Sequence, residues 1–222
     1  GEEQPRAEDH EATGAGEDAT RVVDLFFTTG LAGRVEPCGC TSKPLGGLPK
    51  LATVIESSPV PHGLVAAGAL LLPTEGIDEV TRAQHLEKAA VIARAFRKLG
   101  ASAINLAAAD LSEGVELMEA LQREGSVPLV SANVRPRGRG GPEIARSYVR
   151  VLGDVRFGVT GVTIPERVPD ATRGVAALEF APALKAEVAS LRAAEVDVVI
   201  VLAALPEAEA RALAEAVPEM DL

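Results

Sequence analysis

The chain has 222 residues, 47% of them hydrophobic and 3% aromatic, with no Trp and a formal net charge of -10 at pH 7. That length suffices for one substantial domain with a tail, and no apolar run approaches the ~20 residues that a membrane-spanning helix needs. The acidic balance argues against broad binding to nucleic acids or anionic membranes, and the scarcity of aromatic residues argues against base-stacking platforms.

Residues 1–20 combine acids, Gly and Ala without an apolar period, which predicts a disordered acidic leader. The sequence begins without Met or a signal peptide, so we expect a processed or trimmed N-terminus. The leader is interpreted either as a simple flexible segment or as a spacer behind a lipidated residue upstream of residue 1.

From Arg21 to Leu222, strand and helix patterns alternate with short connections, which predicts one α/β domain. Strands are expected at 22–29, 64–72, 102–107, 127–134, 146–152, 155–163 and 197–203. Helices are expected at 46–58, 79–99, 112–123, 181–194 and 206–216. Ser112 is expected to cap its helix, and Gly153-Asp154 is a hairpin turn signal. Asp221-Leu222 would begin another strand, so we expect the domain to be truncated at its C-terminal end.

The most specific stretch is the glycine-rich loop after the first strand. It contains both cysteines of the chain, Cys38 and Cys40, and Gly46-Gly47 opens the next helix. A loop between a strand end and a helix start is the usual place for the site of an α/β domain. The CxC pair is consistent with a loop-stabilising disulfide or two thiols, and also with soft-metal or redox chemistry with a partner. Two thiolates leave a tetrahedral zinc site half filled, so the metal alternative needs ligands from another chain.

Two further groups of polar residues are candidates for function. A basic region is interpreted either as a solvated connection or as a contact for an anionic partner; it comprises Arg135, Arg137, Arg139, Arg146, Arg150 and Arg156. His62 and His85 are expected at the surface, and the three histidines of the chain are too scattered for a His-rich metal cluster.

Several segments, taken in order, carry a family resemblance. They are FTTGLAGRVEPCGC with LGGLPKLATVI, then LGASAINLAAADLSEG, PLVSANV, GDVRFGVTGVTIPE, DVVIVLAALP and VPEMDL. Together they resemble the N-terminal domain of the calcineurin-like metallophosphoesterases, in the exported 5′-nucleotidase and UDP-sugar hydrolase branch. The resemblance covers about Arg21 to Leu222 and implies a metallophosphoesterase-like α/β sandwich with mixed central sheets. It also implies an exported protein, periplasmic or in the cell envelope, with a lipid anchor upstream of residue 1 as one alternative.

The resemblance aligns the metal-ligand positions of the family with residues that lack a side-chain donor. These positions are Gly30, Ala32, Ala69, Ala108, Ala109 and Ala204. Asp110 stands at the Glu position of the N-H-E motif, and Asp24 is a second leftover acid. One carboxylate without a base, nucleophile or metal does not make an active site. We therefore expect no bound transition metal, no other cofactor and no catalytic residue.

The replacement of all these ligands together has a physical reason. Clustered carboxylates without their metals repel one another and are costly to bury, so small apolar residues relieve that cost. Scattered drift would leave some ligands behind. Natural degeneration and deliberate replacement are both consistent with this pattern.

Three functional hypotheses follow. The first is a non-catalytic metallophosphoesterase-like domain, a pseudoenzyme that acts as a binding or assembly module with a protein partner in an exported or envelope protein. An alternative is an active metal-dependent 5′-nucleotidase-like phosphoesterase, which rests on the family layout alone. Another alternative is a thiol-based metal or redox module centred on Cys38 and Cys40.

Overall fold

The computed structural model describes residues 22–37, 39, 42, 44–124, 127–137, 143–165 and 174–222. The predicted leader at 1–20 lies outside the described residues. The same holds for Cys38 and Cys40, so the disulfide, thiol and metal alternatives for this pair stay predictions.

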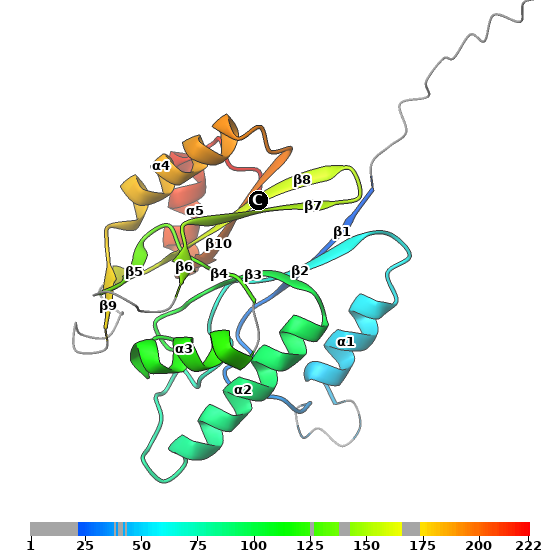
Figure 1. Cartoon of the computed structure of the whole chain (residues 1–222), viewed down its shortest axis with the longest axis vertical. Helices are drawn as coiled ribbons and strands as arrows, with labels where there is room; N and C mark the ends of the chain where they lie inside the picture. Colours follow the sequence, from blue (N-terminus) through cyan, green and yellow to red (C-terminus); the bar gives the residue numbers. More distant parts are fainter. Residues whose placement is uncertain are drawn as a thin grey trace, which may run out of the picture.

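Five parallel strands form the first sheet of the described chain. Their spatial order is β1 (Asp24–Thr28), β2 (His62–Ala66), β3 (Ala101–Asn105), β4 (Leu129–Val130) and β6 (Ile144–Ala145). Helices α1 (Leu48–Glu56), α2 (Arg82–Lys98) and α3 (Gly114–Glu124) lie along its outer face (Figure 1). Apolar side chains are buried between this sheet and its helices, among them Ile55, Leu64, Ile92 and Phe96.

The second sheet has three strands and mixed pairing. Its central strand β8 (Val155–Thr163) pairs parallel with β10 (Val198–Ala204) and antiparallel with β7 (Ser147–Leu152). Its outer face packs on α4 (Phe180–Ala193) and α5 (Glu207–Ala216) through a core that includes Leu184, Val188, Val199 and Leu213. A short antiparallel pair, β5 (Val134–Pro136) with β9 (Val175–Ala177), lies beside these layers.

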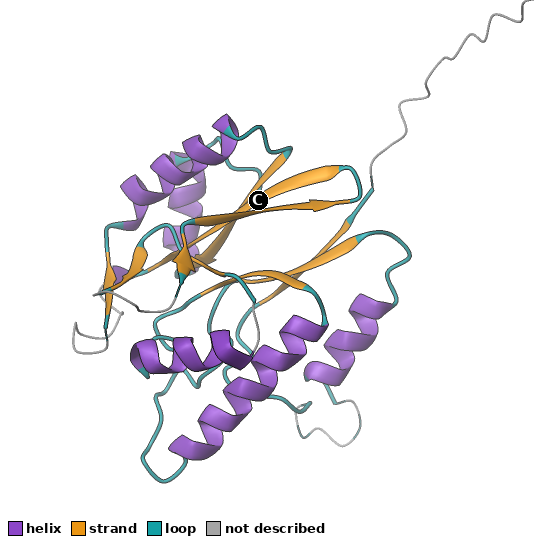
Figure 2. Ribbon diagram, in the orientation of Figure 1, coloured by secondary structure: helices purple, strands orange, loops and turns teal. Residues whose placement is uncertain are grey.

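The two larger sheets face each other, with helices on the outside of both (Figure 2). Side chains of the first sheet, Val65, Ala103 and Val130, form one buried cluster with side chains of the second sheet, including Phe157, Val159 and Ile200. Strands buried on both faces are expected to be almost continuously apolar, which is the pattern of this sequence. The architecture is therefore an α/β sandwich with a parallel and a mixed sheet, as predicted.

A polar seam, made by Asn105, Asn133 and Thr163, joins the two sheets inside this apolar core. The Asn105 side-chain amide donates to the backbone carbonyls of Val162 (2.9 Å) and Leu202 (2.8 Å). The Asn133 amide donates to the Thr163 carbonyl (2.7 Å), and its oxygen accepts from the Thr163 N–H (3.0 Å). All three side chains are buried, so each bond is costly to lose. The seam fixes the ends of strands from both sheets against each other.

The strand predicted at 64–72 has different limits in the structure. It starts at His62 and ends at Ala66, because the chain turns at Gly68 with φ +99°. A Cβ on Gly68 would lie 2.8 Å from the backbone nitrogen of Ala107, so the turn needs glycine. Leu70, Leu71 and Leu72 are buried in the loop that follows, which explains why the apolar run is longer than the strand.

The strand predicted at 127–134 is split, and two short strands, β6 and β9, were not predicted. The chain leaves the first sheet at Ser131, whose hydroxyl accepts a hydrogen bond from the Val134 N–H (3.0 Å). Such local side-chain bonds compete with strand pairing. The predicted cap is also wrong, because α3 begins at Gly114 and the buried Ser112 hydroxyl has no partner among the described residues.

Other predictions agree with the structure within a few residues. The hairpin around Gly153-Asp154 is confirmed as β7 and β8. The α5 helix starts directly after Pro206. At the end of the described chain, the Asp221 N–H donates to the Val199 carbonyl (3.0 Å), so Asp221 lies beside β10, but no strand is formed there.

Candidate functional site

A hollow of about 500 Å³ opens where strands of both sheets end. Thr29 follows β1, Ala67 follows β2, Thr163 ends β8 and Ala204 ends β10, and all four residues line it. The carboxyl ends of parallel strands meet at this edge, which is where α/β sheets usually bind their ligands. The hollow is therefore the candidate site.

Four of the predicted metal-ligand positions line the hollow together. They are Ala69, Ala108, Ala109 and Ala204. The other two, Gly30 and Ala32, belong to the neighbouring loop, which is joined to the wall by backbone hydrogen bonds. Gly30 donates to the Gly68 carbonyl (3.3 Å), and Ala32 donates to the Ala69 carbonyl (2.9 Å). Sequence positions that are up to 174 residues apart, from Gly30 to Ala204, thus surround one edge of the fold.

Two of these positions have a backbone that does not suit alanine. Ala32 (φ 49°) and Ala69 (φ 50°) are in the left-handed region. Asp, Asn and His populate this region several-fold more often than other residues that carry a Cβ. The residues that the family resemblance aligns here are a His and an Asp, so the backbone keeps a conformation that suits the aligned ligand types better than it suits alanine.

The hollow does not fit the metal centre that the fold family implies. Its lining includes alanines, Gly68 and the hydroxyls of Thr29, Thr74 and Thr163, and no described residue brings a carboxylate, imidazole or thiol to it. Methyl groups offer no donor to Mn, Zn or Fe, which need nitrogen, sulfur or carboxylate ligands. Among the described residues, no group of three or more His, Cys, Asp or Glu side chains is arranged to hold a metal ion.

Asp110, the leftover acid beside the hollow, has a structural role. Its carboxylate is fully buried and accepts from the backbone N–H groups of Leu70 (3.0 Å), Leu71 (2.8 Å) and Ala107 (3.0 Å). Burial raises the pKa of the Asp110 carboxyl, and these hydrogen bonds act in the opposite direction. The side chain therefore holds the two loops that form the wall, and its oxygens point to backbone donors.

The threonines at the strand ends were not singled out from the sequence. The Thr29 hydroxyl donates to the Gly68 carbonyl (3.1 Å), and the Thr163 hydroxyl donates to the Leu106 carbonyl. Both bonds fix loops that line the hollow. The only sequence signal for them is their place directly after an apolar strand pattern.

Three residues that the sequence singles out lie elsewhere. Asp24 is at the start of β1, at the opposite end of the strand from the hollow, and accepts from the Ser58 hydroxyl (2.7 Å). The interpretation of Asp24 as an acid near the site is therefore wrong. His62 and His85 are half-buried instead of exposed. The His62 ring packs edge-on against Phe26, with ring centroids 6.1 Å apart.

The predicted basic region is partly structural. The Arg135 guanidinium donates to the backbone carbonyls of Ser131 (2.6 Å), Ala132 (2.7 Å) and Val134 (2.6 Å), where the chain leaves the first sheet. Burial and the nearby charge of Arg146 lower the pKa of Arg135. Arg139 lies outside the described residues, and the interpretation of the region as a contact for an anionic partner stays a prediction.

Among the described residues, none of the helices combines the length and the apolar character that a membrane crossing requires.

Comparison with solved structures identifies the fold. The 5′-nucleotidase precursor of Thermus thermophilus is 24% identical over 86% of this chain and 38% of its own, with a TM-score of 0.72. The sulfate thiohydrolase SoxB of Thermus thermophilus is 15% identical over 90% of this chain and 46% of its own (TM-score 0.68). The calcineurin-like phosphoesterase YfkN of Bacillus subtilis is 18% identical over 81% of this chain and 60% of its own (TM-score 0.59).

These likenesses show that the chain has the calcineurin-like metallophosphoesterase fold, in the form of the N-terminal domain of 5′-nucleotidase-like proteins. The chain spans less than two thirds of the length of each of these proteins. No family model and no curated protein matches the sequence.

Proposed function

We propose that this chain is a non-catalytic domain with the metallophosphoesterase fold and that it acts as a binding or assembly module for a protein partner. The observation that carries the proposal is the chemistry of the hollow. Four positions that the family resemblance assigns to metal ligands meet there, and each has only a methyl group. Among the described residues of its lining, no carboxylate, imidazole or thiol is present to act as a general base or to ligate a metal that would activate water.

The preserved scaffold supports a binding role. The seam residues and Asp110 hold the strand ends and loops in place through buried hydrogen bonds around the hollow. The small alanine side chains leave the hollow open, whereas larger apolar side chains at these positions would fill it. A cavity of about 500 Å³ lies in the range of ligand and anchor-residue pockets.

We also propose that the domain belongs to an exported or envelope protein. The support is indirect: the Thermus thermophilus 5′-nucleotidase with this fold is described as a precursor. The proposed location is tested by fractionating the source cells and detecting the domain in each fraction with an antibody. Recovery in the cytoplasmic fraction would contradict it.

The function itself is tested by metal analysis and by hydrolysis of bis(p-nitrophenyl) phosphate and AMP with added Mn or Zn. The Thermus thermophilus 5′-nucleotidase serves as the positive control. We expect less than one transition metal ion per ~10 chains and no turnover above the buffer rate. About two metal ions per chain, the content of a two-metal centre, or metal-dependent turnover would establish the active-hydrolase alternative instead.

A further inference from the structure

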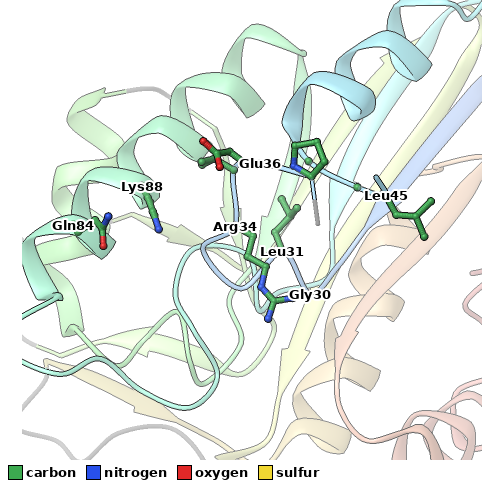
Figure 3. Close-up of a pocket in the computed structure, with 11 residues that line it drawn as sticks. Gly30, Leu31, Arg34, Glu36, Leu45, Gln84 and Lys88 are labelled. Carbon is green, nitrogen blue, oxygen red and sulfur yellow. The ribbon is translucent and has the colours of Figure 1, made fainter. Parts of the chain in front are cut away.

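A second cavity is lined by the loop that carries Gly30. Its volume is about 630 Å³, and it is separate from the hollow at the strand ends. One wall is the loop with Leu31, Arg34 and Glu36, and the opposite wall is α2 with Gln84 and Lys88 (Figure 3). We call it the loop–helix cavity.

The walls of the loop–helix cavity are rigidly supported. On one side, the loop is held by backbone hydrogen bonds: the Ala32 N–H donates to the Ala69 carbonyl (2.9 Å), and the Gly33 N–H donates to the Leu70 carbonyl (3.1 Å). Another backbone hydrogen bond, from the Leu48 N–H to the Val35 carbonyl (3.0 Å), joins the loop to the start of α1. Gly47 has φ +83° and its missing Cβ would lie 2.6 Å from the Pro37 nitrogen, so the two loop segments pack closely.

The helix wall is equally fixed. Gln84 and Lys88 are four residues apart on α2 and therefore lie on the same face of the helix. Further along α2, Ile92 and Phe96 are buried and anchor the helix in the core. A cavity between such supports needs little reorganisation to accept a ligand.

The charged side chains that line the cavity form no ion pair with one another or with other described residues. Arg34 and Lys88 are its cations and Glu36 is its anion. None of these three side chains makes a hydrogen bond or an ion pair with any described residue, and Gln84 also has no such partner. A guanidinium and an ammonium on facing walls, with an amide beside them, are donors suited to an oxyanion. The rest of the lining includes the apolar side chains of Leu31, Val35 and Leu45.

We propose that the loop–helix cavity binds a small organic anion, whose acidic group pairs with Arg34 and Lys88 and whose apolar part contacts Leu31 and Val35. The acidic group is an oxyanion, either a carboxylate or a phosphate monoester. The cavity volume matches the range of small-molecule sites. Since the chain carries a formal net charge of -10, this cationic site gives an anion a local attraction that the rest of the molecule does not.

The experiment titrates the protein with benzoate and with phenyl phosphate, followed by NMR of the backbone amides. We expect a Kd of about 1 mM for at least one of them, with shifts at Leu31, Gly47 and Lys88. The better of the two ligands identifies the acidic group. Benzyl alcohol, the neutral analogue, is expected not to shift these amides. Equal binding of benzyl alcohol, or shifts confined to Ala108, Ala109 and Ala204, would overturn the proposal.

Charge variants test the residues. Arg34→Gln and Lys88→Gln should each weaken binding about tenfold, because each removes a charged hydrogen-bond donor. Glu36→Gln should tighten it, since it removes the anion of the cavity; a gain of affinity cannot come from misfolding. Lys98→Gln is the matched control, because Lys98 is exposed on the same helix, about 15 Å further along and beyond the Debye length. Weakening by Lys98→Gln equal to that by Lys88→Gln, or no effect of Arg34→Gln, would refute the site.

Discussion

At the scale of single residues, Ala69 combines a left-handed backbone with a side chain that does not favour it. Its φ of 50° costs a residue with a Cβ about 1–2 kcal/mol, and its methyl group lines the hollow. The usual explanation for such an outlier is a function that requires the conformation. Here the conformation is kept by backbone hydrogen bonds to the neighbouring loop, such as that from Ala32.

The variant Ala69→Gly should therefore be more stable than the parent chain. Glycine adopts this φ without strain, and its larger entropy in the unfolded chain offsets part of the gain, which leaves an increase of about 0.5–1 kcal/mol in the free energy of unfolding. Urea denaturation measures it. The matched control is Ala186→Gly, at an exposed position of α4, which should lower the free energy of unfolding by about 1 kcal/mol. A loss of stability in both variants would contradict strain at Ala69.

At the scale of elements, the start of α2 depends on one exposed acid. Asp78 accepts from the Thr81 N–H (2.8 Å) and from the Thr81 hydroxyl (2.8 Å) in the turn before the helix. The Thr81 hydroxyl and N–H lower the pKa of Asp78 below its ordinary value. A carboxyl whose pKa is lower in the folded state stabilises the fold above the unfolded pKa. That contribution is lost as the pH falls through the lower folded pKa.

This sign gives a pH prediction for Asp78→Asn. The parent chain should lose stability as the pH falls from the ordinary Asp value of about 3.9 downward, and the variant should lack this part of the loss. Urea denaturation at a series of pH values compares the two slopes. Glu75→Gln removes an exposed carboxylate from the same loop and controls for net charge. Parallel curves for Asp78→Asn and the parent chain would contradict the role of Asp78.

The elements show where sequence patterns suffice and where they fail. The hairpin of β7 and β8 was predictable because its turn signal and its alternation are local. The end of β2 was not, because the turn at Gly68 depends on the close approach of the Ala107 backbone, in the loop after β3. The short strands β6 and β9 have two and three residues, and only their partners make them strands. A pattern within one segment contains no information about such contacts.

The candidate site was likewise predictable from the sequence in some respects and not in others. Motif order and family resemblance predicted six positions around one edge, and the structure brings four of them into one hollow. The conformation of Ala69 and the structural role of Asp110 required coordinates, because both depend on backbone groups that belong to distant segments. The loop–helix cavity was also missed, since Lys88 lies outside every segment that carries the resemblance and only the fold brings it to the same cavity as Arg34.

At the scale of the whole molecule, the polar seam couples the two sheets. Gly161 in β8 faces Asn105 in β3, and a Cβ on Gly161 would lie 2.3 Å from the Asn105 side-chain oxygen. The amide of Asn105 meanwhile bonds the carbonyls of Val162 and Leu202 in the second sheet. Close approach of the strands and the hydrogen bonds of the seam therefore depend on each other.

The variant Gly161→Ala should lower the free energy of unfolding by about 1–3 kcal/mol, because the added methyl displaces Asn105 from its buried carbonyl partners. Asn105→Ala alone should cost a similar amount. In the double variant, the cost of Gly161→Ala should be clearly smaller, since the atoms that it overlaps are gone. A double-mutant cycle by urea denaturation measures the coupling. If the unfolding free-energy costs of the two single variants add fully in the double variant, Gly161→Ala does not act through Asn105.

The sequence separation between Asn105 and its hydrogen-bond partners also determines when these bonds can form during translation. Its two carbonyl partners come 57 and 97 residues later in the chain. At the usual rate of translation, the second partner is made about 5–20 s after Asn105 leaves the peptidyl-transferase centre. During that interval the second sheet, which covers the inner face of the first, still lacks β10. We expect nascent chains to stay bound to holding chaperones until β10 has emerged from the ribosome and the Asn105 amide can form its buried hydrogen bond to Leu202.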